Sequence, residues 1–231
     1  MMLIGQGLTE AVALLARGDP QVLRIAGLTL LVSLAATALS LLVGVPFGTL
    51  VALSRFPGRR LLVTATHTGM GLPPVTVGLI VTLLLWRSGP FGWLELLYTP
   101  AAIVLAQTII ALPLVTGLTV AAVGSLPAEL AHQLQSLGAA PLQLLRLLLH
   151  EARLPLLAAV AAGFGSVVSE VGASMMVGGN IHGQTRVLTT ATVLETQRGR
   201  FDLALAYSIV LLALVFVFNA VLIRLRSARR G

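Results

Sequence analysis

Long apolar stretches alternate with short polar ones along this chain, and the longest polar interruption runs over residues 126–155. A stretch of about twenty apolar residues is long enough to cross a bilayer as a helix. The pattern predicts such spans at residues 22–53, 61–86, 101–124, 156–177 and 203–223. We therefore expect an all-α, polytopic membrane protein with five transmembrane helices and a single transmembrane domain over residues 1–231.

The N-terminal segment has a helical apolar face over residues 3–16, but it is too short to span a bilayer. We expect residues 1–19 to form an interfacial helix on the outer side of the membrane. Asp19 is the predicted N-cap of the first span, and Pro20 occupies its first helical position. The first residues lack the basic start of a signal peptide, so the first span would act as the targeting signal.

The polar interruption contains two runs of leucines at helical spacing. These leucines are Leu130, Leu134, Leu137, then Leu142, Leu145 and Leu149. Between the runs lies Gly138-Ala139-Ala140-Pro141, in which glycine favours a helix end and proline a helix start. The pattern predicts two short helices joined at a glycine elbow, which form either a docking surface for another protein or an ordinary loop with interfacial helices.

Small and polar residues recur at regular intervals inside the first span and cluster near the middle of the second. A stripe in the first span indicates close helix packing or the lining of a polar pathway; it consists of Thr29, Ser33, Thr37, Ser40, Gly44 and Gly48. The second span is predicted to break near its middle, because Gly69, Gly71, Pro73 and Pro74 weaken the helix there. Its His67 is either a proton relay or a packing residue with a hydrogen bond.

The fourth span carries a small or polar residue at every fourth position, at Ala158, Ala162, Ser166, Glu170 and Ser174. Glu170 is predicted to face the interior of the helix bundle, with either a structural or a gating role. Residues 178–200 are too polar to span, and they contribute hydrogen-bond donors that include Asn180, Thr185, Arg186 and Thr189.

Composition supports the membrane assignment and excludes several chemistries. Hydrophobic residues make up 57% of the chain, charged residues 10%, and the mean hydropathy is +0.97. The fifteen basic residues are all arginines, and they lie near span ends rather than on a nucleic-acid-binding face. Without lysine the chain has no Walker phosphate loop, and without cysteine it has no disulfide or thiolate ligand. The four histidines are scattered, so no metal site is predicted, and the serine in Gly163-Phe164-Gly165-Ser166 is misplaced for a protease motif.

The arginines also predict the orientation. Nine arginines lie on the side of residues 54–60, residues 126–155 and the C-terminus, and six lie on the other side. Because cytoplasmic loops are enriched in positive residues, we expect the N-terminus outside, and the 126–155 loop and the C-terminus inside the cell.

The 126–155 loop resembles the coupling loop of permease subunits of type I ABC importers. In that family the loop reads Glu-Ala-Ala, three residues, Gly, and later Leu-Pro. Here Gly138 and Leu154-Pro155 occupy the matching positions, and His132-Gln133-Leu134 stand where the family has Glu-Ala-Ala. Residues 71–79, Ala106-Gln107 and Leu112-Pro113 resemble the permeases for molybdate, tungstate and sulfate, and residues 151–190 resemble the tungstate-type branch most closely.

The resemblance implies an ATP-driven importer of a tetrahedral oxyanion, most closely tungstate, in the prokaryotic inner membrane. The implied partners are a second copy of the chain, two cytoplasmic ATPase subunits that bind ATP and Mg, an external oxyanion-binding protein and the lipid bilayer. This chain would need no cofactor and would not be an enzyme itself. The implied ATPase-coupling residues are His132, Gln135, Ser136, Leu137, Gly138, Ala139, Ala140 and Pro141.

A dianion can cross the hydrocarbon layer of a membrane only along a path that is lined by hydrogen-bond donors and free of carboxylates. The candidate pathway and gate residues are Ser33, Thr37, Pro73, Pro74, Thr76, Glu170, Asn180, Thr185, Arg186 and Thr189. Arg186 either attracts or gates the anion, or forms a salt bridge or a binding-protein contact. The alternatives for the whole chain are an ion-driven carrier that uses Glu170 and His67 as a proton pair, and a channel. The carrier is disfavoured because no internal repeat is seen, and the channel because no filter segment is seen.

Overall fold

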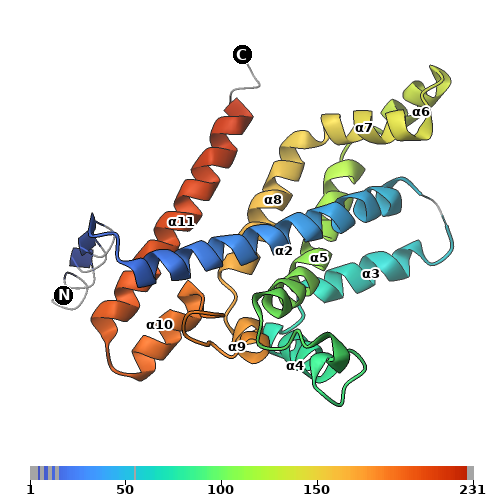
Figure 1. Ribbon diagram of the computed structural model, residues 1–231. Helices are drawn as coiled ribbons and strands as arrows, with labels where there is room; N and C mark the ends of the chain where they lie inside the picture. Colours follow the sequence, from blue (N-terminus) through green and yellow to red (C-terminus); the bar gives the residue numbers. More distant parts are fainter. Residues whose placement is uncertain (1–4, 6–7, 10–11, 14–15, 55, 228–231) are drawn as a thin grey trace.

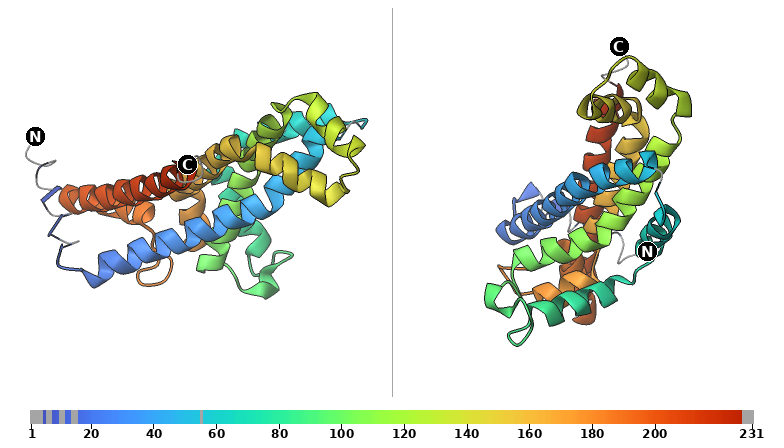
Figure 2. Two further views of the ribbon diagram at one scale, coloured as in Figure 1. Left: turned by 90° about the horizontal axis from the view of Figure 1, so that it is seen from above. Right: turned by 90° about the vertical axis from the view of Figure 1, so that its right-hand side faces the viewer.

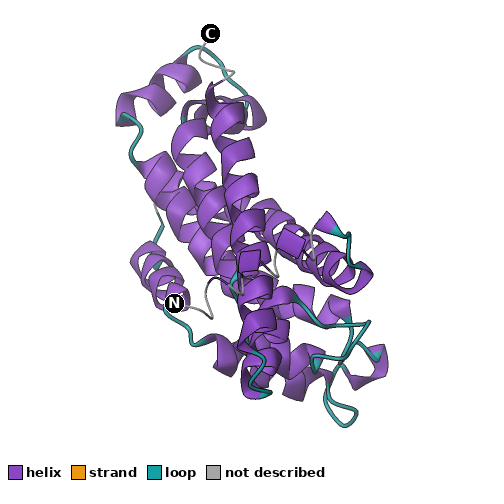
Figure 3. Cartoon of the chain, turned by 90° about the vertical axis from the view of Figure 1, so that its left-hand side faces the viewer, coloured by secondary structure: helices purple, strands orange, loops and turns teal. Residues whose placement is uncertain are grey.

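The computed structural model describes residues 5, 8–9, 12–13, 16–54 and 56–227, and within them every regular element is a helix (Figures 1 and 3). The all-α prediction is confirmed. The helix predicted at residues 1–19 falls largely outside the described residues. The elements are α2 Pro20–Leu53, α3 Arg59–Met70, α4 Pro74–Leu85, the 3-10 turn η1 Gly92–Leu94, α5 Pro100–Gly124, α6 Ala128–Ser136, α7 Pro141–Glu151, α8 Arg153–Val168, α9 Gly172–Gly178, α10 Leu188–Gln197 and α11 Phe201–Ser227.

Three of the described helices, α2, α5 and α11, are each long and apolar enough to cross a membrane. Two further pairs, α3 with α4 and α7 with α8, pass the same test only as bent units. By length and composition the described residues therefore provide three to five crossings. The five-span arrangement stays a prediction within that range.

The start of α2 follows the predicted capping pattern. The Asp19 carboxylate accepts hydrogen bonds from the backbone N–H groups of Gln21 at 2.9 Å and Val22 at 3.0 Å. Pro20 occupies the first turn, where a missing N–H costs nothing. The local sequence therefore decides where this helix begins.

Close packing joins α2 to α5 (Figures 1 and 2). A methyl group at Gly48 would lie 2.7 Å from the carbonyl oxygen of Thr116 and 2.8 Å from Cβ of Thr119. At Gly44 it would lie 3.0 Å from Val115. Glycine therefore allows the two backbones to approach, and the packing interpretation of the stripe holds at these two positions.

The predicted break in the second span is confirmed. Helix α3 ends at Met70 and α4 begins at Pro74, and their axes differ by 99°. The backbone N–H groups of Gly71 and Leu72 bond to the last carbonyls of α3, while Pro73 has no N–H to donate. The chain therefore turns sharply without leaving these two N–H groups unsatisfied.

The fourth span departs from the prediction, which placed one continuous helix over residues 156–177. Helix α8 ends at Val168 and α9 begins at Gly172, so Glu170 and Ser174 do not continue the row from Ala158 to Ser166. The Ser169 hydroxyl donates to the Gly165 carbonyl oxygen at 2.7 Å, a local bond that competes with helix continuation. A regular four-residue spacing did not reveal this break.

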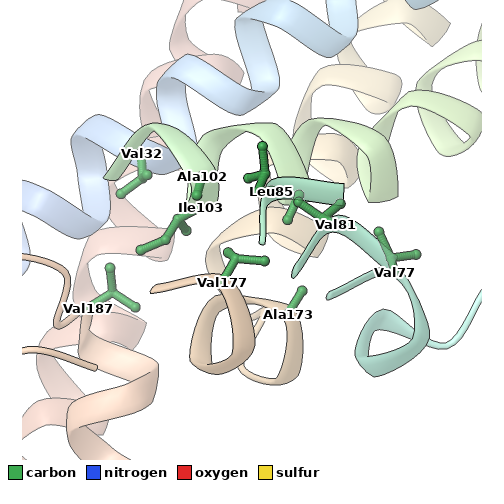
Figure 4. Packing of buried hydrophobic residues seen from close by; sticks show 10 residues of the cluster. Val32, Val77, Val81, Leu85, Ala102, Ile103, Ala173, Val177 and Val187 are labelled. Atoms are coloured by element: carbon green, nitrogen blue, oxygen red, sulfur yellow. The ribbon is translucent and has the colours of Figure 1, made fainter. Parts of the chain in front are cut away.

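The main apolar core lies where the two broken spans meet α2 and α5 (Figure 4). Its buried side chains come from α2, α4, α5, α9 and the segment before α10; they include Val32, Val77, Val81, Leu85, Ala102, Ile103, Ala173, Val177 and Val187. The short helices α4 and α9 pack against each other in this core. Gly78 of α4 lies against Ala173 of α9, since a methyl group at Gly78 would be 2.7 Å from Cα of Ala173.

Candidate functional site: the elbow and the helix breaks

The 126–155 loop forms two helices at a sharp turn, as predicted. The N–H of Gly138 bonds to the Gln135 carbonyl at 2.9 Å, and the N–H of Ala139 bonds to the Leu134 carbonyl at 3.0 Å. This pair of bonds is a Schellman cap, which requires a residue with positive φ; Gly138 has φ +80°. Helix α7 then begins at Pro141, three residues later.

The turn between α6 and α7, which we call the elbow (residues 132–142), projects from one end of the molecule (Figure 1). Leu137 is 84% exposed and Leu142 is 57% exposed. A methyl group at Gly138 would meet no atom within 4 Å. Every predicted coupling residue lies on this elbow and all except the half-buried Ala139 are exposed: His132, Gln135, Ser136, Leu137, Gly138, Ala140 and Pro141.

The elbow is attached to the membrane helices through α7. Leu148 is 1% exposed and Ala152 is fully buried, so the buried face of α7 centres on Leu148 rather than on Leu142, Leu145 and Leu149. Helix α8 follows directly at Arg153, after a bend of 76°. No loop therefore separates α7 from α8.

A cavity of about 620 Å³ lies between the elbow helices and the ends of α2 and α5. Arg59, which lines it, donates from Nε to the Val51 carbonyl oxygen at 2.8 Å and so binds the start of α3 to the end of α2. In the sequence, Arg59 is one of the nine arginines from which the orientation is predicted. Its structural role could not be read from the sequence, because the accepting carbonyl lies eight residues away across a turn.

Glu170 lies in the break between α8 and α9. It is 8% exposed, and its Oε1 accepts a hydrogen bond from the Ala173 N–H at 2.9 Å. Its backbone carbonyl accepts a hydrogen bond from the Thr189 hydroxyl at 2.9 Å. Gly172 lies against the first turn of α4, since a methyl group there would be 2.6 Å from Val75. The structure thus brings the two breaks and α10 together around Glu170.

Among the pathway candidates, Pro73 is the N-cap of α4, and Pro74 and Thr76 belong to its first turn. They are neighbours of Val75 in the chain and therefore lie near Gly172 and Glu170. Thr189 of α10 contributes a hydroxyl directly to this junction, and Thr76 is exposed on the first turn of α4. Five of the ten predicted pathway and gate residues therefore lie at this junction: Pro73, Pro74, Thr76, Glu170 and Thr189.

The loop before α10 holds a second group of candidates. The Thr185 hydroxyl donates to the Gly178 carbonyl and accepts from the Ile181 N–H. Arg186 donates from Nε to Asn180 Oδ1 at 3.2 Å and from Nη2 to the Asn180 carbonyl at 3.3 Å. These bonds stabilise the loop and hold the Arg186 guanidinium in one orientation.

Ser33 and Thr37 are buried in α2. Among the described residues, neither side chain forms a hydrogen bond with the junction at Glu170 or with the loop before α10. The Thr37 hydroxyl donates to the Ser33 carbonyl of its own helix at 2.7 Å. Thr37 also lies near Gly163 of α8, since a methyl group there would be 4.0 Å from its Cγ2. Their part in a pathway stays a prediction.

Gln107 of α5 is a further residue at the break. It is 3% exposed and donates from Nε2 to the Val167 carbonyl at 3.3 Å and to Ser174 Oγ at 3.2 Å. It therefore bridges α8 and α9 across their break. A single side-chain amide within the apolar span 101–124 was the only sign in the sequence that Gln107 matters. Its partners could not be read from the sequence, because they lie 60 and 67 residues away.

Glu195 at the end of α10 was not singled out by the sequence analysis. It is 5% exposed, and it forms ion pairs with Arg198 at 3.2 Å and with Arg200 at 2.6 Å. The spacing in the sequence, with arginines three and five residues after the glutamate, could have predicted these ion pairs. These pairs hold the turn between α10 and α11.

The proton-pair arrangement of the alternative carrier finds no support in the described residues. His67 is exposed on α3, and no hydrogen bond or ion pair between it and Glu170 is found there. Among the same residues no group of three or more His, Cys, Asp or Glu is placed to hold a metal ion.

Two curated relatives are similar to this chain over nearly its whole length. The tungstate uptake system permease protein TupB of Peptoclostridium acidaminophilum is 39% identical over 227 residues, which cover 98% of this chain and 100% of that protein. A probable anion ABC transporter permease protein of Haloferax volcanii is 40% identical over 212 residues, 90% of this chain and 91% of that protein.

The fold is similar to a chain in a solved structure described as inward facing conformations of the MetNI methionine ABC transporter. The TM-score is 0.72, with 20% identity, and the match covers 91% of this chain and 98% of that one. Residues 44–228 match the family described as binding-protein-dependent transport system inner membrane component. The chain, with its exposed elbow between α6 and α7, therefore belongs to the family of binding-protein-dependent transport system inner membrane components.

Proposed function

We propose that this chain is the membrane permease subunit of an ATP-driven ABC importer for a tetrahedral oxyanion, and that the oxyanion is tungstate. The observation that carries the proposal is the exposed elbow at Gly138, in a chain similar over 98% of its length to a tungstate permease. The chain provides the pathway and has no ATPase site of its own.

The assembly that we propose contains two copies of this chain, two cytoplasmic ATPase subunits and an external oxyanion-binding protein. The ATPases bind ATP and Mg, and this chain carries no cofactor. Its orientation follows from the arginine distribution: the elbow and the C-terminus face the cytoplasm and the N-terminus faces outward. In Figure 1, α6, α7 and the last turns of α11 lie at one end, and α10 lies at the other.

The connections described above suggest how ATP binding would open and close the pathway. Closure of the ATPases displaces the elbow as a rigid body, and the direct α7–α8 connection transmits this displacement to α8. Helix α8 ends at Val168, so the displacement reaches the break at Glu170, where α4, α9 and α10 meet. Glu170 and Thr189 are the contacts that we expect to change between the inward and outward states.

The anion needs hydrogen-bond donors along its path, because transfer of a charged group into an apolar medium without partners is very unfavourable. We propose that side-chain hydroxyl, amide and guanidinium groups, together with backbone N–H groups, supply these donors; the predicted residues with such side chains are Ser33, Thr37, Thr76, Asn180, Thr185, Arg186 and Thr189. The other predicted residues, Pro73, Pro74 and Glu170, have no such donor, and we propose them as gate residues at the breaks.

Reconstitution of the full complex in vesicles tests the proposal. Tungstate uptake should require the ATPase subunits, the binding protein and ATP, and it should persist when the proton gradient is collapsed. The permease chain alone should accumulate no tungstate. Uptake by the chain alone, or uptake that follows the proton gradient, would instead support a secondary carrier.

Selectivity is tested separately. Calorimetry of the cognate binding protein with tungstate, molybdate and sulfate should give the tightest binding for tungstate. Tighter binding of sulfate or molybdate would correct the anion while leaving the importer assignment intact.

A further inference from the structure

A pocket of about 220 Å³ lies at the start of α2, against the loop that precedes α10. In Figure 1 this region lies at the opposite end of α2 from the elbow. Its wall includes Arg24, Arg186, His182, Gln21 and Gln184. These side chains present hydrogen-bond donors, and no residue of the described wall is an aspartate or a glutamate.

Arg24 supplies the first positive charge of the pocket. No ion pair of Arg24 with an acidic residue is found in the part of the chain that the structure describes. Its guanidinium lies beside Gly183, because a methyl group at Gly183 would be 3.8 Å from Arg24 Nη1. Gly183 has φ +74°, a backbone conformation that other residues rarely adopt, and this turn brings the loop against Arg24.

Arg186 supplies the second charge, and its orientation is set by Asn180. Nε and Nη2 of Arg186 donate to the side chain and the backbone carbonyl of Asn180. Both acceptors are neutral, so these bonds orient the guanidinium without cancelling its charge. No bond from Nη1 is found among the described residues, so that group can donate to a ligand in the pocket.

The two nearest acids do not cancel these charges. Asp19 and Glu195 line the neighbouring cavity of about 390 Å³, which shares Gln21, His182 and Arg186 with the first pocket. Glu195 is paired with Arg198 and Arg200, whereas Asp19 keeps its negative charge, because its two partners are neutral N–H groups. The four arginines of the two cavities nevertheless exceed these two acids by two charges. A positive field therefore remains at Arg24 and Arg186.

We propose that this pocket is a receiving site for the oxyanion at the outer mouth of the permease, with Arg24 and Arg186 as its charged ligands. Arginine suits this role because its planar group donates two hydrogen bonds at once to a tetrahedral oxyanion. The proposal rests on the outward orientation and the substrate class given under Proposed function. It adds a site, and the residue Arg24, in front of the gate at Glu170.

The test measures tungstate binding to the purified permease–ATPase complex in detergent solution, in a buffer without phosphate and without the binding protein. Equilibrium dialysis with elemental analysis should show saturable binding of one tungstate per permease chain. Arg24→Gln should weaken this binding about tenfold, as expected for the loss of one charge-assisted contact. Arg87→Gln, an exposed arginine outside the pocket wall, removes the same charge and should leave binding unchanged.

Arg24 makes no hydrogen bond that the Gln variant would remove from the described structure, so the test does not depend on a folding defect. Equal binding by the Arg24 and Arg87 variants, or no saturable binding to the wild-type complex, would overturn the proposal. So would displacement of tungstate by phosphatidylglycerol but not by sulfate, which would assign the pocket to a lipid headgroup. Weaker binding-protein affinity with unchanged tungstate binding would assign it to a protein contact.

ATP-dependent uptake by the wild-type complex is measured in parallel. Uptake without binding in the pocket would leave the proposed function standing and remove only this site. Absence of uptake despite binding would remove the proposed function instead.

Discussion

The hydroxyl of Thr189 donates a hydrogen bond at 2.9 Å to the backbone carbonyl oxygen of Glu170, and so joins α10 to the break between α8 and α9. The Glu170 carboxylate meanwhile accepts the Ala173 N–H at the start of α9. One residue thus closes the break on both sides. This arrangement makes the structural role of Glu170 specific enough to test against a role in proton transfer.

Glu170→Gln should keep most ATP-driven uptake, because an amide oxygen can accept the Ala173 N–H as the carboxylate does. Glu170→Ala removes this acceptor and should destabilise the protein by about 1 kcal/mol, as for other lost helix caps. Thermal unfolding in detergent and uptake in vesicles check the two variants. Loss of uptake in the Gln variant with unchanged stability would point to titration of the carboxyl group.

Gly138→Glu should abolish attachment of the ATPase subunits while leaving membrane insertion intact. A Cβ atom added at Gly138 meets no atom within 4 Å and the elbow is exposed, so we expect the effect of the glutamate to fall on whatever contacts the elbow. Gly58→Glu is the matched control, because Gly58 also has positive φ (+90°) and open space around it. Each variant carries a similar backbone cost of about 1–2 kcal/mol.

Co-purification of the ATPase with each variant measures the difference. We expect normal recovery with the Gly58 variant and little with the Gly138 variant. Equal recovery with both would show that the elbow is not the ATPase contact.

Gly48→Ala should destabilise the bundle by about 1–3 kcal/mol, since the added methyl would overpack the α2–α5 contact at the Thr116 carbonyl. Gly27→Ala lies in the same helix with nothing within 4 Å, and it should be neutral or slightly stabilising. Unfolding temperatures of the two variants in detergent provide the comparison. A Gly48 variant as stable as the Gly27 variant would contradict the close approach of these helices.

Glu195→Gln should loosen the turn between α10 and α11, because it removes the anionic partner of Arg198 and Arg200. We expect a loss of about 1–3 kcal/mol, the range for hydrogen bonds to charged groups. The loss should shrink in high salt, which screens ion pairs with half-exposed arginines. Glu151→Gln, an exposed acid, is the control and should show neither effect.

Much of the fold could be predicted from local sequence. Asp19-Pro20 predicted the start of α2, and Gly138 with Pro141 predicted the elbow, because capping and turn preferences depend on adjacent residues. The prolines at 73 and 74 predicted the break in the second span for the same reason. The all-α class followed from the lengths of the apolar stretches.

The break in the fourth span could not be predicted in this way. Ser169, Glu170 and Val171 contain neither glycine nor proline, and the break depends on contacts made elsewhere. Thr189 bonds to the Glu170 carbonyl, and Gln107 bonds to the Val167 carbonyl of the preceding helix. These partners come from α10 and α5, and no pattern within residues 156–177 contains them.

The sequence by itself determined which segments are apolar enough to enter a membrane and where caps, turns and prolines end a helix, because those preferences act over a few neighbouring residues. The tertiary structure decided which side chains share a site. It placed Glu170 at the meeting point of two breaks, and it placed Arg24 beside Gly183 and in one pocket with Arg186. Distances between residues far apart in the chain depend on how the helices pack, and packing is set by the whole bundle.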